Sequence, residues 1–433
     1  LLKNYLPAGE TLPAVPAALP VIEIPEFHFH KVAPLFSNLP EAKQTVDIQP
    51  MEQFNQGWGT ILYRTTLPET TLAGTTLKIT EVHDWAQIYA DGKLLARLDR
   101  RKGEFTTTLP ALKKGTQLDI LVEAMGRVNF DKSIHDRKGI TEKVELISGN
   151  QTKELKNWTV YNFPVDYSFI KDKKYSDTKI LPTMPAYYKS TFTLDKVGDT
   201  FLDMSTWGKG MVWVNGHAMG RFWEIGPQQT LFMPGCWLKE GENEILVLDL
   251  KGPTRASIKG LKKPILDVLR EKAPETHRKD GEKLKLTGEK VGHEGAFTPG
   301  NGWQEVRFAT PVKGRYFCLE ALSPQANDNI AAIAEFDVLG ADGKPVSREH
   351  WKIRYADSEE TRSGNRTADK IFDLQESTFW MTVDNVPYPH QLVIDLSKVE
   401  NVTGFRYLPR AEKGYPGMIK EYRVYVKPAD FNY

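Results

Sequence analysis

Residues 208–223 read GKGMVWVNGHAMGRFW and contain the clearest structural signal in the chain. At their centre, the dipeptide Asn215-Gly216 supplies what a two-residue hairpin turn needs, because both positions of such a turn adopt positive φ. From residue 57 to residue 250, short stretches of alternating apolar and polar residues are separated by Asp-Gly, Asn-Gly or Lys-Gly. This pattern predicts antiparallel β-sheet with tight hairpins.

The hairpin belongs to an internal repeat with three landmarks. In chain order, the matched pairs are Tyr63–Leu67 with Tyr188–Phe192, Ile88–Lys93 with Val212–His217, and Leu112–Val122 with Leu238–Val247. The offset is nearly constant, since residue 63 matches 188, 88 matches 212 and 112 matches 238. Because order and spacing are both preserved, the repeat predicts two domains with one sandwich fold.

Composition and charge narrow the class of protein. A chain of 433 residues is too long for one core, so we expect roughly two to four domains. The net charge of +1 argues against a nucleic-acid partner held by its phosphates. No apolar run approaches the length of a membrane span. Cys236 and Cys318 lie far apart in the sequence and predict buried free thiols rather than a disulfide.

Changes in composition divide the chain. The first 44 residues are rich in proline, which predicts an extended connector with at most an edge strand at Val21–Ile24. Residues 259–290 are rich in Lys, Glu and Asp and predict a solvated linker. Within it, Pro264–Lys272 predicts a short helix, because Pro is tolerated in the first turn. The expected segments are 1–44, a first sandwich at 45–150, a second at 151–258, the linker at 259–290 and a third β domain at 291–433.

Residues 208–223 and their continuation through 225–231 resemble the second jelly-roll domain of the β-galactosidases of glycoside hydrolase family 35. Upstream stretches echo the same family: Gly59–Thr66, His83–Trp85, Tyr89–Gly92, Gly126–Phe130 and Lys138–Ile140. Residues 1–20 look like the family's exit from its catalytic barrel. The resemblance covers residues 1–255.

The resemblance implies an accessory role for this chain. In the family, a (β/α)₈ barrel precedes these domains and carries two catalytic carboxyl groups about 5 Å apart. Neither the alternating pattern of a barrel nor such a pair is recognisable here. We therefore expect no catalytic residues, a parent enzyme that removes terminal β-galactosyl groups, and a missing barrel of the same polypeptide as partner. The start at Leu1, without Met or a signal peptide, predicts a longer polypeptide. The substrate class alone implies a periplasmic or secreted protein.

Residues 291–433 resemble discoidin-like (coagulation-factor type C) modules, which are jelly rolls that often bind galactose-type sugars. The stretches that carry the resemblance are 368–373, 377–380, 389–396, 403–410 and 419–426. Residues 303–338 resemble the closing half of the family pattern but come first here. A circularly permuted domain would give this order, and so would two incomplete modules in series. The expected fold class is thus all-β, with two jelly-roll or galactose-binding-like sandwiches and a third, discoidin-like one.

The discoidin resemblance also implies a Ca²⁺ ion. Its ligands would be the carbonyl oxygens of Lys370 and Ala334 and the side chains of Asp373, Gln375, Thr378 and Glu335. Such an oxygen set suits Ca²⁺, which takes six to eight oxygen ligands. Gln375 replaces a usual acidic residue or Asn, and Leu374 replaces a usual Gly, so we expect weaker binding. An ordinary turn with salt-bridged carboxylates is the alternative.

Two further sets of residues are candidates for binding. Glu376, His390 and Arg410 lie in loop regions that would hold galactose-containing glycans, because hydroxyls need charged hydrogen-bond partners; for Arg410 a structural ion pair is the alternative. Arg221, Phe222 and Trp223 form a distinctive cluster that we expect to pack against the missing barrel, since Arg beside Trp is common at interfaces. A core position for Trp223 is the alternative.

Three functions remain open from the sequence. The first is the accessory portion of a β-galactosidase. The second is a free-standing lectin-like or adhesive protein built from three sandwiches. The third is an active glycosidase within this chain, which would require a pair of carboxylates in a cleft.

Overall fold

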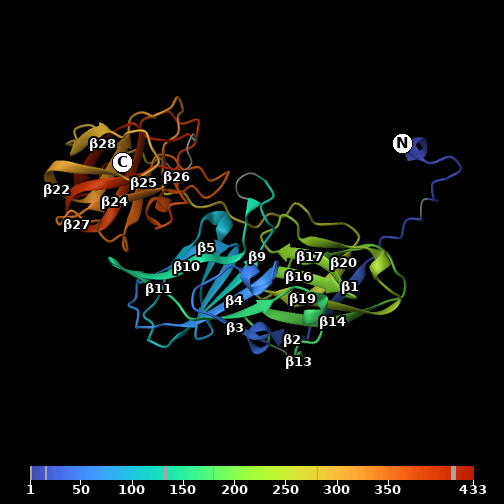
Figure 1. Ribbon diagram of the computed structural model, residues 1–433. Helices are drawn as coiled ribbons and strands as arrows, with labels where there is room; N and C mark the ends of the chain where they lie inside the picture. Colours follow the sequence, from blue (N-terminus) through green and yellow to red (C-terminus); the bar gives the residue numbers. More distant parts are fainter. Residues whose placement is uncertain (1, 15–16, 131–133, 179, 280, 411–415) are drawn as a thin grey trace. The chain divides into compact units, whose positions relative to one another are not determined.

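The computed structural model describes residues 2–14, 17–130, 134–178, 180–279, 281–410 and 416–433. These residues form antiparallel sheets and one short α-helix, α1 (Tyr167–Ile170), so the predicted all-β class is confirmed (Figure 1). No helix among them has the length and apolar character that a membrane crossing needs. The chain divides into unit 1, residues 1–40 with 165–272, and unit 2, residues 41–164 with 273–433.

The first sandwich lies in unit 2 and packs one six-stranded sheet against one four-stranded sheet. Its strands are β3 (Ala42–Thr45), β4 (Gly59–Thr66), β5 (Thr76–His83), β6 (Trp85–Ala90), β7 (Lys93–Asp99), β8 (Thr106–Thr108), β9 (Gln117–Ala124), β10 (Gly139–Ser148), β11 (Gln151–Glu154) and β12 (Trp158–Phe163). The sheet orders are β3-β12-β4-β9-β6-β7 and β11-β10-β5-β8. Alternate residues of β4, such as Ile61 and Tyr63, are fully buried in the core between the sheets.

The second sandwich lies in unit 1. Its strands are β1 (Ile24–His28), β2 (Lys31–Pro34), β13 (Ser176–Asp177), β14 (Ala186–Leu194), β15 (Thr200–Asp203), β16 (Lys209–Val214), β17 (His217–Trp223), β18 (Thr230–Met233), β19 (Gly241–Asp249) and β20 (Ser257–Leu261). The sheet orders are β13-β2-β14-β19-β16-β17 and β1-β20-β15-β18. Short 3-10 helices complete the described elements: Leu2–Tyr5, Leu35–Ser37, Met51–Phe54, Arg100–Lys102, Gly235–Trp237 and Ala368–Phe372.

The strand orders confirm the predicted repeat. The order β4-β9-β6-β7 in the first sandwich corresponds to β14-β19-β16-β17 in the second, and β10-β5-β8 corresponds to β20-β15-β18. The matched hairpins turn at Asp91-Gly92 (φ 45° and 77°) and Asn215-Gly216 (φ 49° and 87°). Both turns therefore place two successive residues in the left-handed region, as the Asn-Gly and Asp-Gly signals predict.

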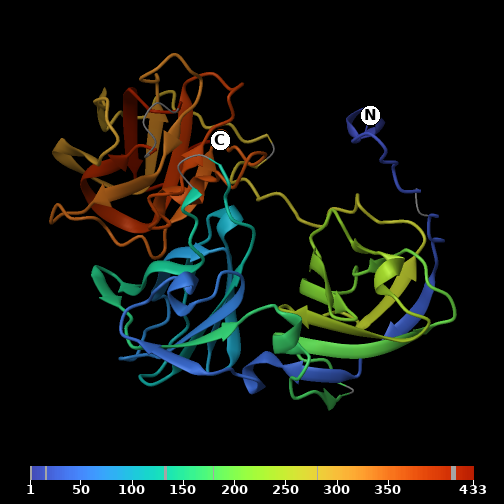
Figure 2. The ribbon, with the colours of Figure 1, turned by 45° about the vertical axis from the view of Figure 1, so that its right-hand side comes forward.

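The boundaries of the two sandwiches differ from those expected. Residues 24–34 are not a free connector, because β1 pairs with β20 and β2 pairs with β14 (Figure 2). Proline is tolerated there because β1 is an edge strand, and Pro34 ends β2. The expected strand at Val21–Ile24 begins instead at Ile24, and Val21 forms only an isolated bridge with Asp199. Residues 158–163 form β12 and complete the first sandwich.

The helix predicted at Pro264–Lys272 does not form. The segment is extended, and its backbone pairs with the loop that follows β17: Gln229 N–H donates to the Ile265 carbonyl at 2.9 Å. Val268 N–H donates to Pro227 at 3.1 Å, and Arg270 N–H donates to Ile225 at 2.7 Å. These partners replace the intrahelical bonds that a helix would have made.

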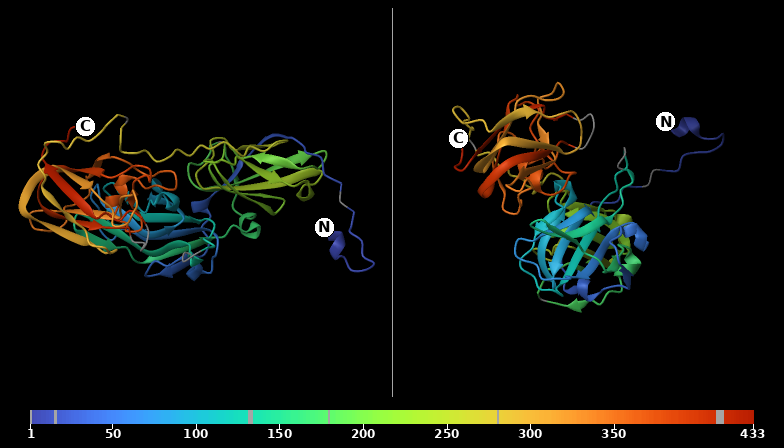
Figure 3. Two further views of the ribbon diagram at one scale, coloured as in Figure 1. Left: turned by 90° about the horizontal axis from the view of Figure 1, so that it is seen from above. Right: turned by 60° about the vertical axis from the view of Figure 1, so that its left-hand side comes forward.

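In its described residues, the third domain has one six-stranded main sheet and one separate two-stranded sheet. Its strands are β21 (His293–Ala296), β22 (Gln304–Ala321), β23 (Ala332–Ile333), β24 (Glu335–Leu339), β25 (Lys352–Ala356), β26 (Trp380–Met381), β27 (His390–Leu408) and β28 (Glu421–Lys427). The main sheet has the order β21-β28-β22-β27-β24, so strands from the two halves alternate (Figure 3). This interleaving excludes two modules in series, and the circular permutation of the single domain stays a prediction.

The two cysteines are both free thiols, as predicted. Cys318 is buried, and burial raises the pKa of its thiol well above the usual value. Cys236 is exposed, contrary to the expectation that both would be buried. Cys236 follows Gly235 within a 3-10 helix at the end of β18, where the chain turns at the surface.

We predict that Gly92→Ala destabilises the first sandwich by about 1–2 kcal/mol, the cost of a left-handed conformation for a residue with a side chain. A Cβ on Gly92 would meet no atom within 4 Å, so the backbone at φ 77° is the only cause. Hydrogen exchange in β6 and β9 of the full chain measures the loss. Gly57→Ala is the matched control, because its added Cβ also meets nothing and its φ is ordinary. Equal effects of the two substitutions would contradict the argument.

Candidate functional site

The predicted calcium ligands gather at one end of the third domain. Asp373 follows the 3-10 helix Ala368–Phe372, and its carboxylate accepts the Thr378 hydroxyl at 2.8 and 2.9 Å and the Gln375 N–H at 3.1 Å. Leu374 between them has φ 65°, the left-handed conformation for which the family's glycine is suited. The loop is therefore folded around Asp373 by its own hydrogen bonds.

Glu335 faces this loop from the start of β24. It is 2% exposed, and its Oε1 atom has no hydrogen-bond partner, as is also true of Oε1 of Gln375. Burial raises the pKa of both Glu335 and Asp373, and the charge of Glu335 raises the pKa of Asp373 further. The buried carboxyl group of Glu335 and the half-buried one of Asp373, with unsatisfied Oε1 atoms on Glu335 and Gln375, form a set that a hard cation would stabilise.

Two protein cations already lie beside these carboxylates. Arg348 makes an ion pair with Glu335 and a second one with Asp337 at 2.6 Å. Lys370 Nζ lies 3.8 Å from Asp373 Oδ2, a looser contact. Within the described residues, no group of three or more His, Cys, Asp or Glu is placed to hold a metal. The side-chain oxygens of Glu335, Asp373, Gln375 and Thr378 are of the kind that Ca²⁺ takes, and the salt bridges leave the Oε1 atoms of Glu335 and Gln375 without a partner.

The three predicted sugar ligands lie in separate environments. Glu376 is exposed and accepts a hydrogen bond from the indole N–H of Trp303 at 3.3 Å. The guanidinium of Arg410 lies over the Phe379 ring, 4.3 Å from its centre.

The structure contradicts the expectation that His390 contacts a sugar. It is 0% exposed, and its ring nitrogens are taken by Asp357 at 2.8 Å and by the Asn329 carbonyl at 2.7 Å. A ring with both nitrogens engaged inside the protein has none left for an external hydroxyl. His390 therefore serves the core of the domain and does not bind sugar.

Sequence reasoning missed a polar cavity in the third domain. It has a volume of about 380 Å³, within the usual range for ligand sites. Its described lining residues are Glu359, Glu360, Thr361, Arg362, Val383, Asp384 and Asn385. Glu359 is committed to structure, because its carboxylate accepts hydrogen bonds from His277 Nδ1 at 2.8 Å and Ala368 N–H at 2.7 Å. The polar turn Asp384-Asn385 after a buried aromatic stretch is the signal in the sequence.

The three residues expected at a barrel interface behave differently from one another. Phe222 is 6% exposed and packs edge-on against Trp207, so it belongs to the core of the second sandwich. Trp223 is half-buried, with Lys209 Nζ 4.1 Å from its ring centre, and Arg221 is exposed. Only Arg221 and Trp223 therefore offer side-chain surface to another body.

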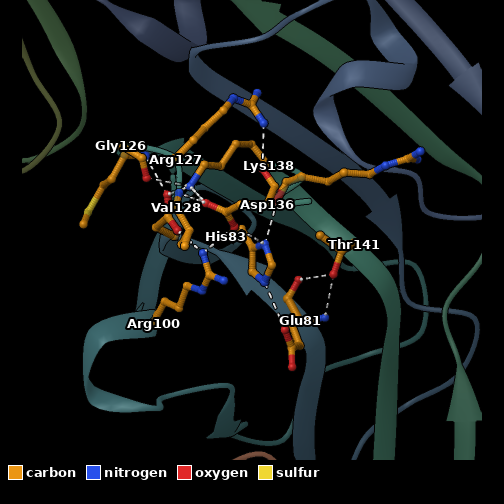
Figure 4. A network of polar contacts seen from close by, with 12 residues as sticks. Glu81, His83, Arg100, Gly126, Arg127, Val128, Asp136, Lys138 and Thr141 are labelled. Carbon is orange, nitrogen blue, oxygen red and sulfur yellow. Dashed lines mark hydrogen bonds and ion pairs between the residues drawn. The ribbon is translucent and has the colours of Figure 1, made fainter. Parts of the chain in front are cut away.

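A buried ionic network in the first sandwich was also missed (Figure 4). Lys138 is 0% exposed, and its Nζ lies 2.7 Å from both Asp84 Oδ2 and Asp136 Oδ2. Arg100 bridges the same two carboxylates at 2.8 and 2.7 Å. Residues from three of the stretches that resemble the galactosidases thus converge here. Lys138 lies 54 positions from Asp84 in the sequence, and no local sequence pattern predicts a contact over that separation.

The charges in this network compensate one another. Burial by itself would raise the pKa of Asp136, but hydrogen bonds from Lys138, the Val128 N–H and Arg100 outweigh it and lower the pKa to about 2. His83 extends the network to Glu81 at 3.0 Å and lowers the pKa of that carboxyl. The network connects residues 126–128 with residues 136–138, because the Gly126 carbonyl accepts from Lys138 at 3.0 Å and the Val128 N–H donates to Asp136 at 3.1 Å.

Comparisons with known proteins identify the domains. Residues 49–164 match the family "Beta-galactosidase, first all-beta domain", residues 185–243 match "Beta-galactosidase, galactose-binding domain", and residues 355–433 match "F5/8 type C domain". "Beta-galactosidase-1-like protein 2" of Homo sapiens is 34% identical over 205 residues, which are 46% of this chain and 30% of that protein. "Beta-galactosidase" of Xanthomonas manihotis is 33% identical over 226 residues, which are 52% and 36%.

The matches cover only part of these relatives. The chain spans between 30% and 40% of the length of the curated relatives it resembles. Among solved structures, a lectin from Pleurotus ostreatus aligns at 10% identity with a TM-score of 0.18, over 56% of this chain and 82% of the lectin. A likeness at that score carries no argument about ligand or fold.

We predict that Lys138→Met lowers the stability of the first sandwich by about 3–5 kcal/mol, because it leaves two buried carboxylates short of a partner. Hydrogen exchange at the amides of β5 and β10 in the full chain reports the loss. Lys143→Met is the matched control: its ion pair with Glu145 is 44% exposed on the lysine side, and such pairs contribute less than about 1 kcal/mol. Similar losses in both variants would show that burial of the charge is not the cause.

Proposed function

We propose that this chain, which is homologous to the β-galactosidases of glycoside hydrolase family 35, supplies the non-catalytic part of such an enzyme and attaches it to galactose-containing glycans. The observation that carries the proposal is the order of its three matched domains: the first all-β domain, the galactose-binding domain and the F5/8 type C domain. The parent enzyme would remove terminal β-galactosyl groups in the periplasm or outside the cell.

The two galactosidase-type sandwiches would support the catalytic domain. In the resembled family, a (β/α)₈ barrel carries the two catalytic carboxyl groups at its C-terminal face, and the described residues of this chain form β-sheets instead. In the second sandwich, the exposed side chain of Arg221 and the half-buried side chain of Trp223 would contact that barrel. The first sandwich, whose buried charge network connects its strands and loops, would support the same barrel.

The third domain would carry the contact with glycans and would hold Ca²⁺. The ion's oxygen ligands would come from Asp373, Glu335, Gln375 and Thr378, with the carbonyls of Lys370 and Ala334. Support comes from the unsatisfied oxygens of Glu335 and Gln375. Bound there, the ion would neutralise the two carboxylates and tie the loop 373–378 to β24.

We predict that the purified chain does not hydrolyse an aryl β-galactoside, because the family's two catalytic carboxyl groups belong to the barrel, while the close pair Asp84 and Asp136 in the first sandwich is neutralised by Lys138 and Arg100. A complete β-galactosidase of the family, assayed at equal concentration, is the positive control. Turnover by the chain at a rate near that of the control would overturn the accessory role.

We predict that Ca²⁺ stabilises the third domain by about 2–4 kcal/mol at saturation, since it binds only the folded loop. Calorimetric melts of the full chain, with calcium and with chelator, should differ in the transition of this domain. Asp373→Asn should abolish the difference, while Asp384→Asn, in the polar cavity of the same domain, should preserve it. Identical melts of the unaltered chain in the two conditions would exclude the ion.

A further inference from the structure

An exposed tryptophan lies beside the loop 373–378, on the outer face of the third domain's main sheet. Trp303 lies directly before β22 and is 37% exposed. Side chains two residues apart on an extended chain share a face, so Trp303 shares one with Glu305. Glu305 pairs in register with Arg406 of β27, and Arg406 pairs with Asp337 of β24. The tryptophan therefore sits at the margin of a row of charged groups.

The ring of Trp303 is held in place from two sides. The guanidinium of Arg406 lies 4.6 Å from the ring centre, and the indole N–H donates to Glu376 Oε1 at 3.3 Å. Arg406 is itself fixed, because its Nε donates to Asp337 at 2.9 Å and Asp337 is only 2% exposed. Arg348 also donates to Asp337 at 2.6 Å. Because these ion pairs already hold the Trp303 ring in place, the side chain loses little conformational entropy when a ligand binds.

This combination suits a sugar better than it suits an apolar partner. A galactopyranose presents a face of C–H groups that stacks on an aromatic ring, while its hydroxyls require charged or polar partners at the rim. Glu376 supplies a carboxylate acceptor and Arg406 supplies guanidinium donors beside the same ring.

We propose that Trp303, Glu376 and Arg406 form a galactoside-binding platform, with Trp303 as its stacking residue. The proposal rests on the function proposed above and locates the glycan contact of the third domain. It retains Glu376 from the residues predicted by sequence and replaces His390, whose ring is buried. The cavity at Asp384 and Asn385 is the competing location, but none of the described residues that line it is aromatic.

The test is a calorimetric titration of the full chain with β-1,4-galactotriose. Trp303→Ala should weaken binding by about tenfold or more, the scale of a lost aromatic contact. Glu376→Gln should weaken it severalfold through loss of the charged acceptor, and Trp303→Phe should retain most of the affinity. Trp58→Ala is the matched control, because Trp58 is another exposed tryptophan, at 46%, in the first sandwich. Melting curves check that each variant is folded. If Trp303→Ala does not fold, the affinities of Glu376→Gln and Trp303→Phe for galactotriose test the platform in its place.

The outcomes separate the platform from the broader function. Loss of affinity on Asn385→Ala, with Trp303→Ala unchanged, would refute the platform and leave glycan binding in place at the cavity. An equal loss on Trp58→Ala would also refute it, because stacking would then not be specific to Trp303. If the unaltered chain gives no binding to galactotriose, lactose or methyl β-galactoside, both the platform and the proposed glycan contact fail.

Discussion

Unbroken antiparallel pairing between two central strands sets the geometry of both repeated sandwiches. β4 pairs with β9 at every residue from Gly59 to Thr66, and β14 pairs with β19 from Ala186 to Leu194, without a bulge in either case. A shift of one residue would move every side chain of these strands to the opposite face of its sheet. The hairpins β6–β7 and β16–β17 then attach beside β9 and β19, so the same strand order arises twice.

Buried charged groups are fully paired in the first sandwich and only partly paired in the third domain. In the first sandwich, Lys138 and Arg100 satisfy Asp84 and Asp136, and the network is closed. In the third domain, Arg348 satisfies one oxygen of Glu335 while the other has no partner. A closed network fixes a structure, whereas an open one carries a continuing desolvation cost that a bound cation can remove. This contrast separates the structural cluster from the candidate ligand site.

The features visible in the sequence are those that depend on neighbouring residues. The turn at Asn215-Gly216 and its counterpart in the first sandwich follow from local φ requirements, and the repeat follows from spacing. The pairing of β2 with β14 could not be predicted, because residues 31–34 and 186–189 are joined only in the folded sheet. The segment 264–272 shows the same limit, since its partner loop at 225–229 replaces the bonds of a helix. For the site, residue types indicated the carboxylates around Asp373, but only the fold brings Trp303 to Glu376.

The division of the second sandwich between residues 1–40 and 165–272 has a consequence for the order in which the chain matures. β2 ends at Pro34, and its neighbour β14 begins at Ala186, after the whole of the first sandwich. At synthesis rates of roughly 5–20 residues per second, the interval between the synthesis of β2 and that of β14 is on the order of ten seconds or more. The first sandwich can close during that interval, because residues 41–164 are continuous. The inserted domain can thus fold before the interrupted one, because the interrupted one lacks the partner strand of β2 until that interval has passed.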